Sequence, residues 1–256
     1  MIRFTGGGPV EFLPDEEARA WLAEGLHEHA ARLGEPACTP RLVLESSMAK
    51  PRDLDDLFEL ICSTQSEVGQ RDVEFTLLEL QPGAAREQIP RDFVPLGDSD
   101  GQLMHTFASG EALLIVVLPA VLKVPALVHG SIARELGRIA IARGGGHRVE
   151  PEDREADAEL AAIALGLGVW VANGAYIYDN KCCGGGCGID LSSLRAGLSL
   201  PEACFALAVD ARRRGLSARV AAKHLEATQK AAFKRNAAFV ERTPALLARS
   251  RAALDG

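Results

Sequence analysis

The sequence predicts an α+β fold, in which a small N-terminal mixed sheet with helices packs on a mainly helical C-terminal half. Strand-like alternation is confined to residues 1–122, whereas residues 123–256 show helical periodicity almost throughout. This order is typical of the α+β class, in which strands and helices are segregated but share one core. The chain has 256 residues, and we expect it to form a single domain, 1–256.

The composition is that of a soluble globular protein. Hydrophobic residues make up 47% of the chain and charged residues 25%, and few aromatic residues are present among many alanines and arginines, which favours helix. No secretory signal follows Met1, and the apolar run at 160–172 is too short to span a bilayer. The six cysteines are typical of free thiols in a reducing compartment. We therefore expect a cytoplasmic protein with no membrane partner.

In the first half, caps and alternation predict each element. Proline and acids at 14–17 predict a helix that continues to Leu33 and is ended by Gly34. A second helix is expected at 53–68. Strands are expected at 8–13, 40–44, 73–80, 103–108 and 112–118. The last of these is apolar throughout, as a central strand is.

In the second half, helices dominate from about Pro125. Residues 127–172 predict two apolar helices joined by a glycine-rich turn, and a loop is expected at 179–188. Further helices are expected at about 200–214, 217–236 and 244–253.

The helix pair carries the sharpest set of charged residues. Arg134 and Arg138 lie four apart and therefore share a helix face, with Glu135 beside them. If the second helix folds back antiparallel, Glu159 near its start reaches that face. In H-E-x-x-H helices, the same spacing supplies two zinc ligands and a general base.

This stretch resembles a bacterial family of zinc metallopeptidase-like proteins of the zincin type. Its members carry an A-H-E-L-G-H helix, followed by an acid-bearing helix that runs into L-G-x-G-V-x-x-A-N. The corresponding segments here are A-R-E-L-G-R at 133–138, Glu159-Leu160, L-G-L-G-V at 165–169 and A-N at 172–173. The similarity covers roughly residues 124–210. The resemblance implies a zincin-like core helix pair.

Both positions at which the family has zinc-binding histidines are arginine in this chain. Arginine has no lone pair to donate and stays protonated, so the resemblance implies a degenerate site and no zinc cofactor. Glu135, at the general-base position, and Glu159, at the third-ligand position, are kept. We predict that salt bridges fill the site and that Glu159 pairs with at least one arginine. Glu155 is the reserve partner, while Asp157 points elsewhere.

Histidines offer a weaker alternative for a metal site. His147 lies in the glycine turn and could swing toward Glu159, but a turn histidine that faces water is the simpler interpretation. His129 does not share a helix face with Arg134. His27 and His29 lie two apart, and we expect both at the surface.

The loop at 179–188 contains Cys182, Cys183 and Cys187 among glycines. Three thiols suggest a zinc or redox module, but adjacent cysteines fit one tetrahedral ion poorly and no fourth ligand is evident. An irregular loop with free thiols is the preferred interpretation.

Charge is distributed unevenly. Residues 211–252 contain eleven Lys or Arg but only Glu226 and Glu241 as acids, so this segment carries +9 and leaves −16 for the rest of a chain whose net charge is −7. We expect a solvated basic helical face, with binding of an anionic partner as the alternative. The negative net charge argues against a nucleic-acid binder.

These observations favour a pseudoenzyme that has lost its metal site and acts as a binding or regulatory protein with a protein partner. One alternative is a metal-independent hydrolase with Glu135 as its base. The other is the thiol-based module at Cys182, Cys183 and Cys187.

Overall fold

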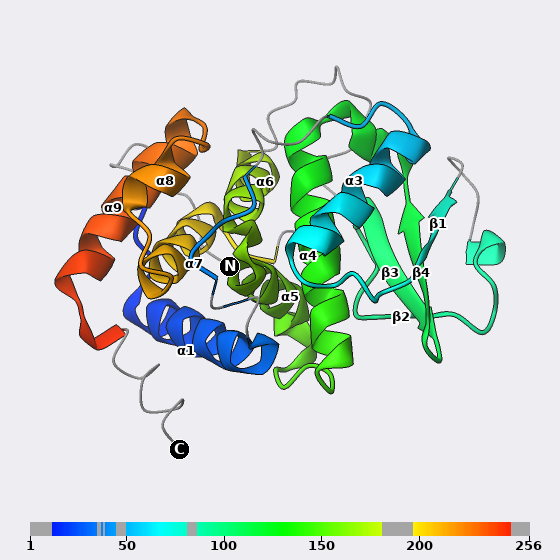
Figure 1. The fold of residues 1–256 in the computed structure, drawn as a ribbon, viewed down its shortest axis with the longest axis horizontal. Helices are drawn as coiled ribbons and strands as arrows, with labels where there is room; N and C mark the ends of the chain where they lie inside the picture. The colour runs from blue at the N-terminus through cyan, green and yellow to red at the C-terminus, as the bar shows by residue number, and fades with distance from the viewer. Residues whose placement is uncertain are drawn as a thin grey trace.

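The protein is represented by a computed structural model, which describes residues 12–34, 37, 39–44, 50–80, 86–180 and 197–246. A small sheet lies at one end with the helices α3 (Leu54–Glu67) and α4 (Pro125–Arg143) beside it, and the other described helices extend to the opposite end (Figure 1). This arrangement confirms the predicted α+β fold with a helical C-terminal half. Residues 8–11 of the expected strand, residues 181–188 of the expected cysteine loop and most of the expected helix at 244–253 lie outside the described residues. Residues 12–13 are not in a strand, and residues 179–180 belong to a helix.

The sheet has four described strands in the order β1-β4-β3-β2. They are β1 (Thr76–Glu79), β2 (Val94–Pro95), β3 (Met104–Ser109) and β4 (Ala112–Val117). β1 pairs parallel with β4, and the other pairs are antiparallel. The apolar β4 is central, as predicted. The strand expected at 40–44 is wrong, because the backbone of Val43 instead donates a hydrogen bond of 2.9 Å to the carbonyl of Gly166.

The N-terminal helices begin and end where their caps predict. In α1 (Glu16–Leu33), Asp15 accepts a hydrogen bond from the backbone of Ala18, and Gly34 follows the helix with a φ of 64°. In α3 (Leu54–Glu67), Asp53 accepts from the backbone of Asp56. Short 3-10 turns occupy η2 (Arg86–Gln88), η3 (Pro119–Lys123) and η4 (Pro151–Asp153).

The helix pair consists of α4 (Pro125–Arg143) and a broken second helix. The second helix comprises α5 (Arg154–Ala162), the π turn η5 (Ile163–Leu167) and α6 (Gly168–Asn180). The break lies at Gly166, whose φ of 98° is readily adopted only by glycine. The freed carbonyls are used, since that of Gly166 accepts from Val43 and that of Ala164 accepts from Arg214 at 2.5 Å.

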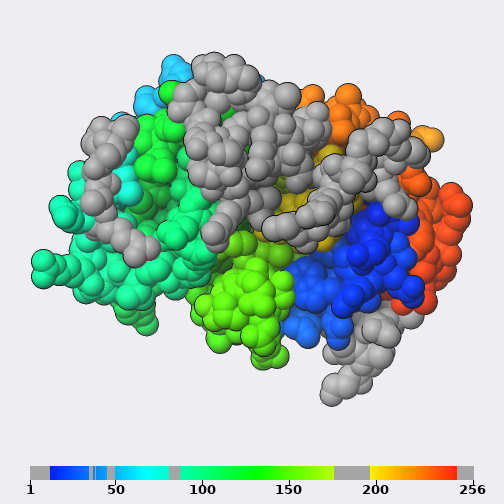
Figure 2. Space-filling model, turned by 180° about the vertical axis from the view of Figure 1, so that it is seen from behind, coloured from blue at the N-terminus to red at the C-terminus, as the bar shows by residue number. Residues whose placement is uncertain are grey.

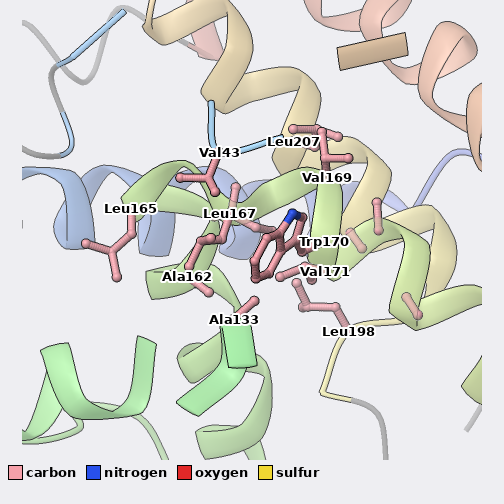
Figure 3. Packing of buried hydrophobic residues seen from close by; sticks show 14 of the residues in the cluster. Val43, Ala133, Ala162, Leu165, Leu167, Val169, Trp170, Val171, Leu198 and Leu207 are labelled. Carbon is pink, nitrogen blue, oxygen red and sulfur yellow. The ribbon is translucent and has the colours of Figure 1, made fainter. Parts of the chain in front are cut away.

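The apolar segment Pro151–Ala175 is the one described helix that is long and apolar enough to cross a membrane. Its most apolar window is 100% buried inside the protein, so its apolar character fits the core helix of a soluble protein. Trp170 lies at the centre of that core, among side chains that include Ala133, Ala162 and Leu207 (Figure 3).

The last described helices are α7 (Leu200–Arg213), α8 (Ala218–Ala222) and α9 (Ala227–Arg242). The single helix expected at 217–236 is therefore wrong, because residues 223–226 interrupt it. The side chain of Asn173 stabilises this break, donating to the carbonyl of His224 at 3.0 Å and accepting from the backbone of Glu226 at 3.4 Å.

Candidate functional site

The candidate site lies between α4 and α5, where the two backbones touch. A Cβ atom placed on Gly137 would lie 2.1 Å from the carbonyl oxygen of Ala158, so only glycine permits this approach. The approach brings the charged face of α4 against the acids of α5, as the spacing predicts. Arg134, Glu135 and Arg138 are each only 1% exposed, and Glu159 is 4% exposed.

Arg134 pairs with Glu159, which confirms the predicted ion pair. Its Nη2 and Nε atoms lie 2.6 and 2.9 Å from Glu159 Oε1, and its Nη1 donates to the side-chain oxygen of Gln102. The second oxygen of Glu159 accepts from the backbone of Leu198 at 2.7 Å. Each charge thus has several partners, as burial of an ion pair requires.

Arg138 engages the two remaining carboxylates. Its Nη1 and Nη2 atoms donate to the two oxygens of Glu155, both at 2.9 Å, and its Nε donates to Glu135 at 3.1 Å. Burial lowers the pKa of Arg138, but the carboxylates of Glu135 and Glu155 outweigh burial and raise it overall. The guanidinium therefore stays charged, and Glu155 is a full member of the network, beyond its expected reserve role.

Glu135 is held on its other side by the sheet. Its Oε2 accepts hydrogen bonds from the backbone and the hydroxyl of Thr106, both at 2.8 Å. Burial alone raises the pKa of Glu135, but the charge of Arg138, with further contributions from His105 and Thr106, lowers it overall. An ionised carboxylate with these partners is poorly suited to abstract a proton, since a general base works best with a pKa near the working pH.

Residues 96–102 form a strap that closes the site. The carbonyl of Leu96 accepts from Arg138 Nη1 at 2.8 Å, and Gln102 donates to Glu155 at 3.1 Å while it accepts from Arg134. Gly97 lies so close that a Cβ atom there would approach Arg138 Nη1 to 2.6 Å. Residues 96–102, which precede β3, therefore cover both arginines.

The residues of this site do not fit a zinc ion. If zinc lay between residues 134, 138 and 159, two of its three ligand positions would present guanidinium groups, which lack lone pairs and repel a dication. The carboxylates are already held by N–H donors of those groups. Among the described residues, no group of three or more His, Cys, Asp or Glu side chains is arranged to hold a metal ion.

A second charged cluster lies on the opposite side of α5. His29 Nε2 lies 2.5 Å from one oxygen of Asp157, and His147 Nδ1 lies 2.7 Å from the other. Burial raises the pKa of Asp157, but hydrogen bonds and charge from the two histidines outweigh it and hold this pKa well below its usual range. The helix α1 lies beside the α4–α5 turn (Figure 2), which explains how these distant residues meet.

This cluster corrects two expectations for histidines and agrees with one for Asp157. His29 is buried and not at the surface. His147 does not face water as expected, because its side chain is only 14% exposed and contacts Asp157; it does not contact Glu159 either. Asp157 points away from the arginines, as predicted, because residues two apart on a helix face different ways. The sequence itself indicates that His29 is buried, because His29 lies on the same apolar face of α1 as Leu22 and Leu26.

The other histidine and cysteine candidates that the structure describes do not join the site. His129 packs against Trp170, with 4.5 Å between ring centroids. Cys204 is buried, and burial raises the pKa of its thiol to about 12, so this cysteine is unreactive. Cys182, Cys183 and Cys187 lie outside the described residues.

Comparison with known proteins gave no match: no family model, no curated protein and no solved structure is similar to this chain.

Proposed function

We propose that this protein is a pseudoenzyme with a zinc-metallopeptidase-like fold, which has lost its metal site and acts in the cytoplasm by binding a protein partner. One observation carries the proposal: the ion-pair network of Arg134, Glu135, Arg138 and Glu159 occupies the positions that the resemblance assigns to zinc and its general base. The network is buried and its groups are mutually satisfied, so it leaves no open coordination position.

A metal-independent hydrolase is less well supported. Such an enzyme would need Glu135 to reach a substrate water, yet this carboxylate is 1% exposed and accepts hydrogen bonds from Thr106 and Arg138. A base with a lowered pKa also binds a proton weakly at neutral pH.

Metal content and peptidase activity test the proposal together. We expect the purified protein, after incubation with equimolar zinc and gel filtration, to retain no stoichiometric metal and to leave a fluorogenic casein substrate uncleaved. The Arg134→His, Arg138→His double variant is the matched comparison. It restores two nitrogen ligands beside Glu159 and should gain zinc that the parent lacks.

The outcomes separate the three interpretations. Stoichiometric zinc in the parent protein that is lost in Glu159→Gln would overturn the proposal. Zinc that survives Glu159→Gln but is lost when Cys182, Cys183 and Cys187 become serine would instead support the thiol module. Casein cleavage abolished by Glu135→Gln would support the hydrolase.

A further inference from the structure

The cations of α8 and α9 point away from the body of the protein. These helices lie at the end of the molecule opposite the sheet (Figure 1). The residues that α9 buries are Gln229, Ala232, Phe233, Asn236 and Val240. The α8–α9 cationic surface, as we call it, comprises the cations outside this buried face, namely Arg219, Lys223, Lys230, Lys234, Arg235 and Arg242. All of these cations except the half-buried Lys230 are exposed. The exposed acids Glu226 and Glu241 lie on the same segment, so cations outnumber acids there by six to two.

Some arginines elsewhere in the described chain have acidic partners. Arg32 pairs with Glu28, Arg52 with Asp56, and Arg143 with Asp72. Other exposed arginines without such partners, for example Arg91 and Arg148, lie on separate segments, whereas the cations of this surface are gathered on two neighbouring helices. Within the described residues, no cation of the α8–α9 cationic surface forms an ion pair. These charges are therefore free to meet a partner without first breaking an internal contact.

Like charges four residues apart repel each other in both helices. Arg219 and Lys223 lie four apart, as do Lys230 and Lys234, so like charges face each other across single helical turns. Such pairs destabilise a helix slightly, and an anion bound between them would remove the repulsion.

The chemistry of the surface favours an acidic protein segment over other polyanions. The described large hydrophobic side chains that are exposed are Phe58 and Val94, which belong to α3 and β2, so this surface has no large apolar or aromatic group to insert into a membrane or stack on bases. The segment 211–252 carries +9, but the rest of the chain carries −16 and repels a long polyanion that extends past the surface. A short acidic segment avoids that repulsion.

We propose that the α8–α9 cationic surface binds an acidic segment of a partner protein. This inference rests on the proposed function, because a protein whose degenerate metal site is closed must bind its partner through another surface. The recognition consists of carboxylates that meet Arg and Lys side chains, with Arg235 and Arg242 able to bind carboxylates through two parallel hydrogen bonds.

The test is binding of a fluorescently labelled poly-glutamate peptide, measured by anisotropy at about 50 mM and about 200 mM salt. The Lys223→Glu, Lys234→Glu, Arg235→Glu variant should bind the peptide at least roughly tenfold more weakly than the parent, and the salt dependence should fall with it. The matched control is Lys50→Glu, Arg91→Glu, Arg148→Glu, which reverses three exposed cations on other elements and should bind within about twofold of the parent. Circular dichroism establishes that both variants are folded.

Several outcomes would overturn the inference. They are equal weakening by the two triple variants, tighter binding of a DNA duplex or of anionic vesicles than of the peptide, and salt-sensitive self-association that accounts for the anisotropy. None of these outcomes bears on zinc content, so failure here is distinguishable from failure of the pseudoenzyme proposal.

Discussion

At the scale of single residues, the buried charges of the candidate site depend on one another. Glu159→Ala leaves the guanidinium of Arg134, which is 1% exposed, without its hydrogen-bonded carboxylate. Glu155 Oε2 remains, but at 3.9 Å from Arg134 Nε. We expect the free energy of unfolding to fall by roughly 3–5 kcal/mol, as when one partner of a buried pair is removed. Urea unfolding measures this, with the exposed Glu59→Ala in α3 as a control that should change by about 0.5 kcal/mol or less. A loss below about 1 kcal/mol would mean that the pair is in effect solvated.

His105 should make the protein sensitive to mild acid. It lies on β3 beside Phe107, and neither of its buried ring nitrogens has a hydrogen-bond partner among the described residues. Burial lowers its pKa, with smaller opposing contributions from charges such as Glu135, so the folded protein takes up a proton less readily than the unfolded chain does. The contribution of His105 to the free energy of unfolding is therefore fully present above pH ~6.5. It is lost progressively as the pH falls below that value.

The measurement is urea unfolding at about pH 7.5 and about pH 5.5, for the parent and for His105→Phe. His105 should contribute up to about 1.4 kcal/mol of the loss between these values, and the phenylalanine variant should lack that part. An equal loss in both proteins would show that other groups, such as the half-buried His27, cause the whole effect.

At the scale of elements, the contact of α4 with α5 sets the geometry of the network. Gly137→Ala places a Cβ atom 2.1 Å from the carbonyl oxygen of Ala158 and 2.8 Å from the backbone nitrogen of Ala162. Neither atom is the end of a flexible side chain, so the helices must separate, and we expect a loss of roughly 3 kcal/mol or more. Ala142→Gly, at an exposed position of α4, should cost only about 1 kcal/mol through helix propensity. Similar losses for the two variants would argue against close helix contact.

At the scale of the whole molecule, we expect folding to be independent of metal. The core is a large apolar cluster that includes Trp170 and residues of both the sheet and the helices, and it needs no metal to close it. The melting temperature should therefore not change on addition of a chelator, and replacement of Cys182, Cys183 and Cys187 by serine should hardly alter it. A large drop on chelation would show that metal binding is coupled to folding, as in structural zinc sites.

The sequence by itself determined the features that depend on neighbours along the chain. The caps of α1 and α3, the apolar β4 and the shared face of Arg134 and Arg138 follow from local spacing, because hydrogen bonds and side-chain contacts three or four residues apart are set by the helix itself. The pairing of Arg134 with Glu159 could also be predicted from the sequence, because in an antiparallel helix pair few positions on the second helix allow an acid to contact that face.

Only the tertiary structure decided which residues from distant segments complete each cluster. Gln102 and Thr106 reach the network from 32 and 29 residues away, and His29 reaches Asp157 across 128 residues. Likewise, residues 40–44 form no strand, because the turn at Gly166 offers Val43 a carbonyl partner where a neighbouring strand does not. The physical reason is that a buried polar group takes whichever partner packing brings within hydrogen-bond distance, and that choice is made by the assembled core.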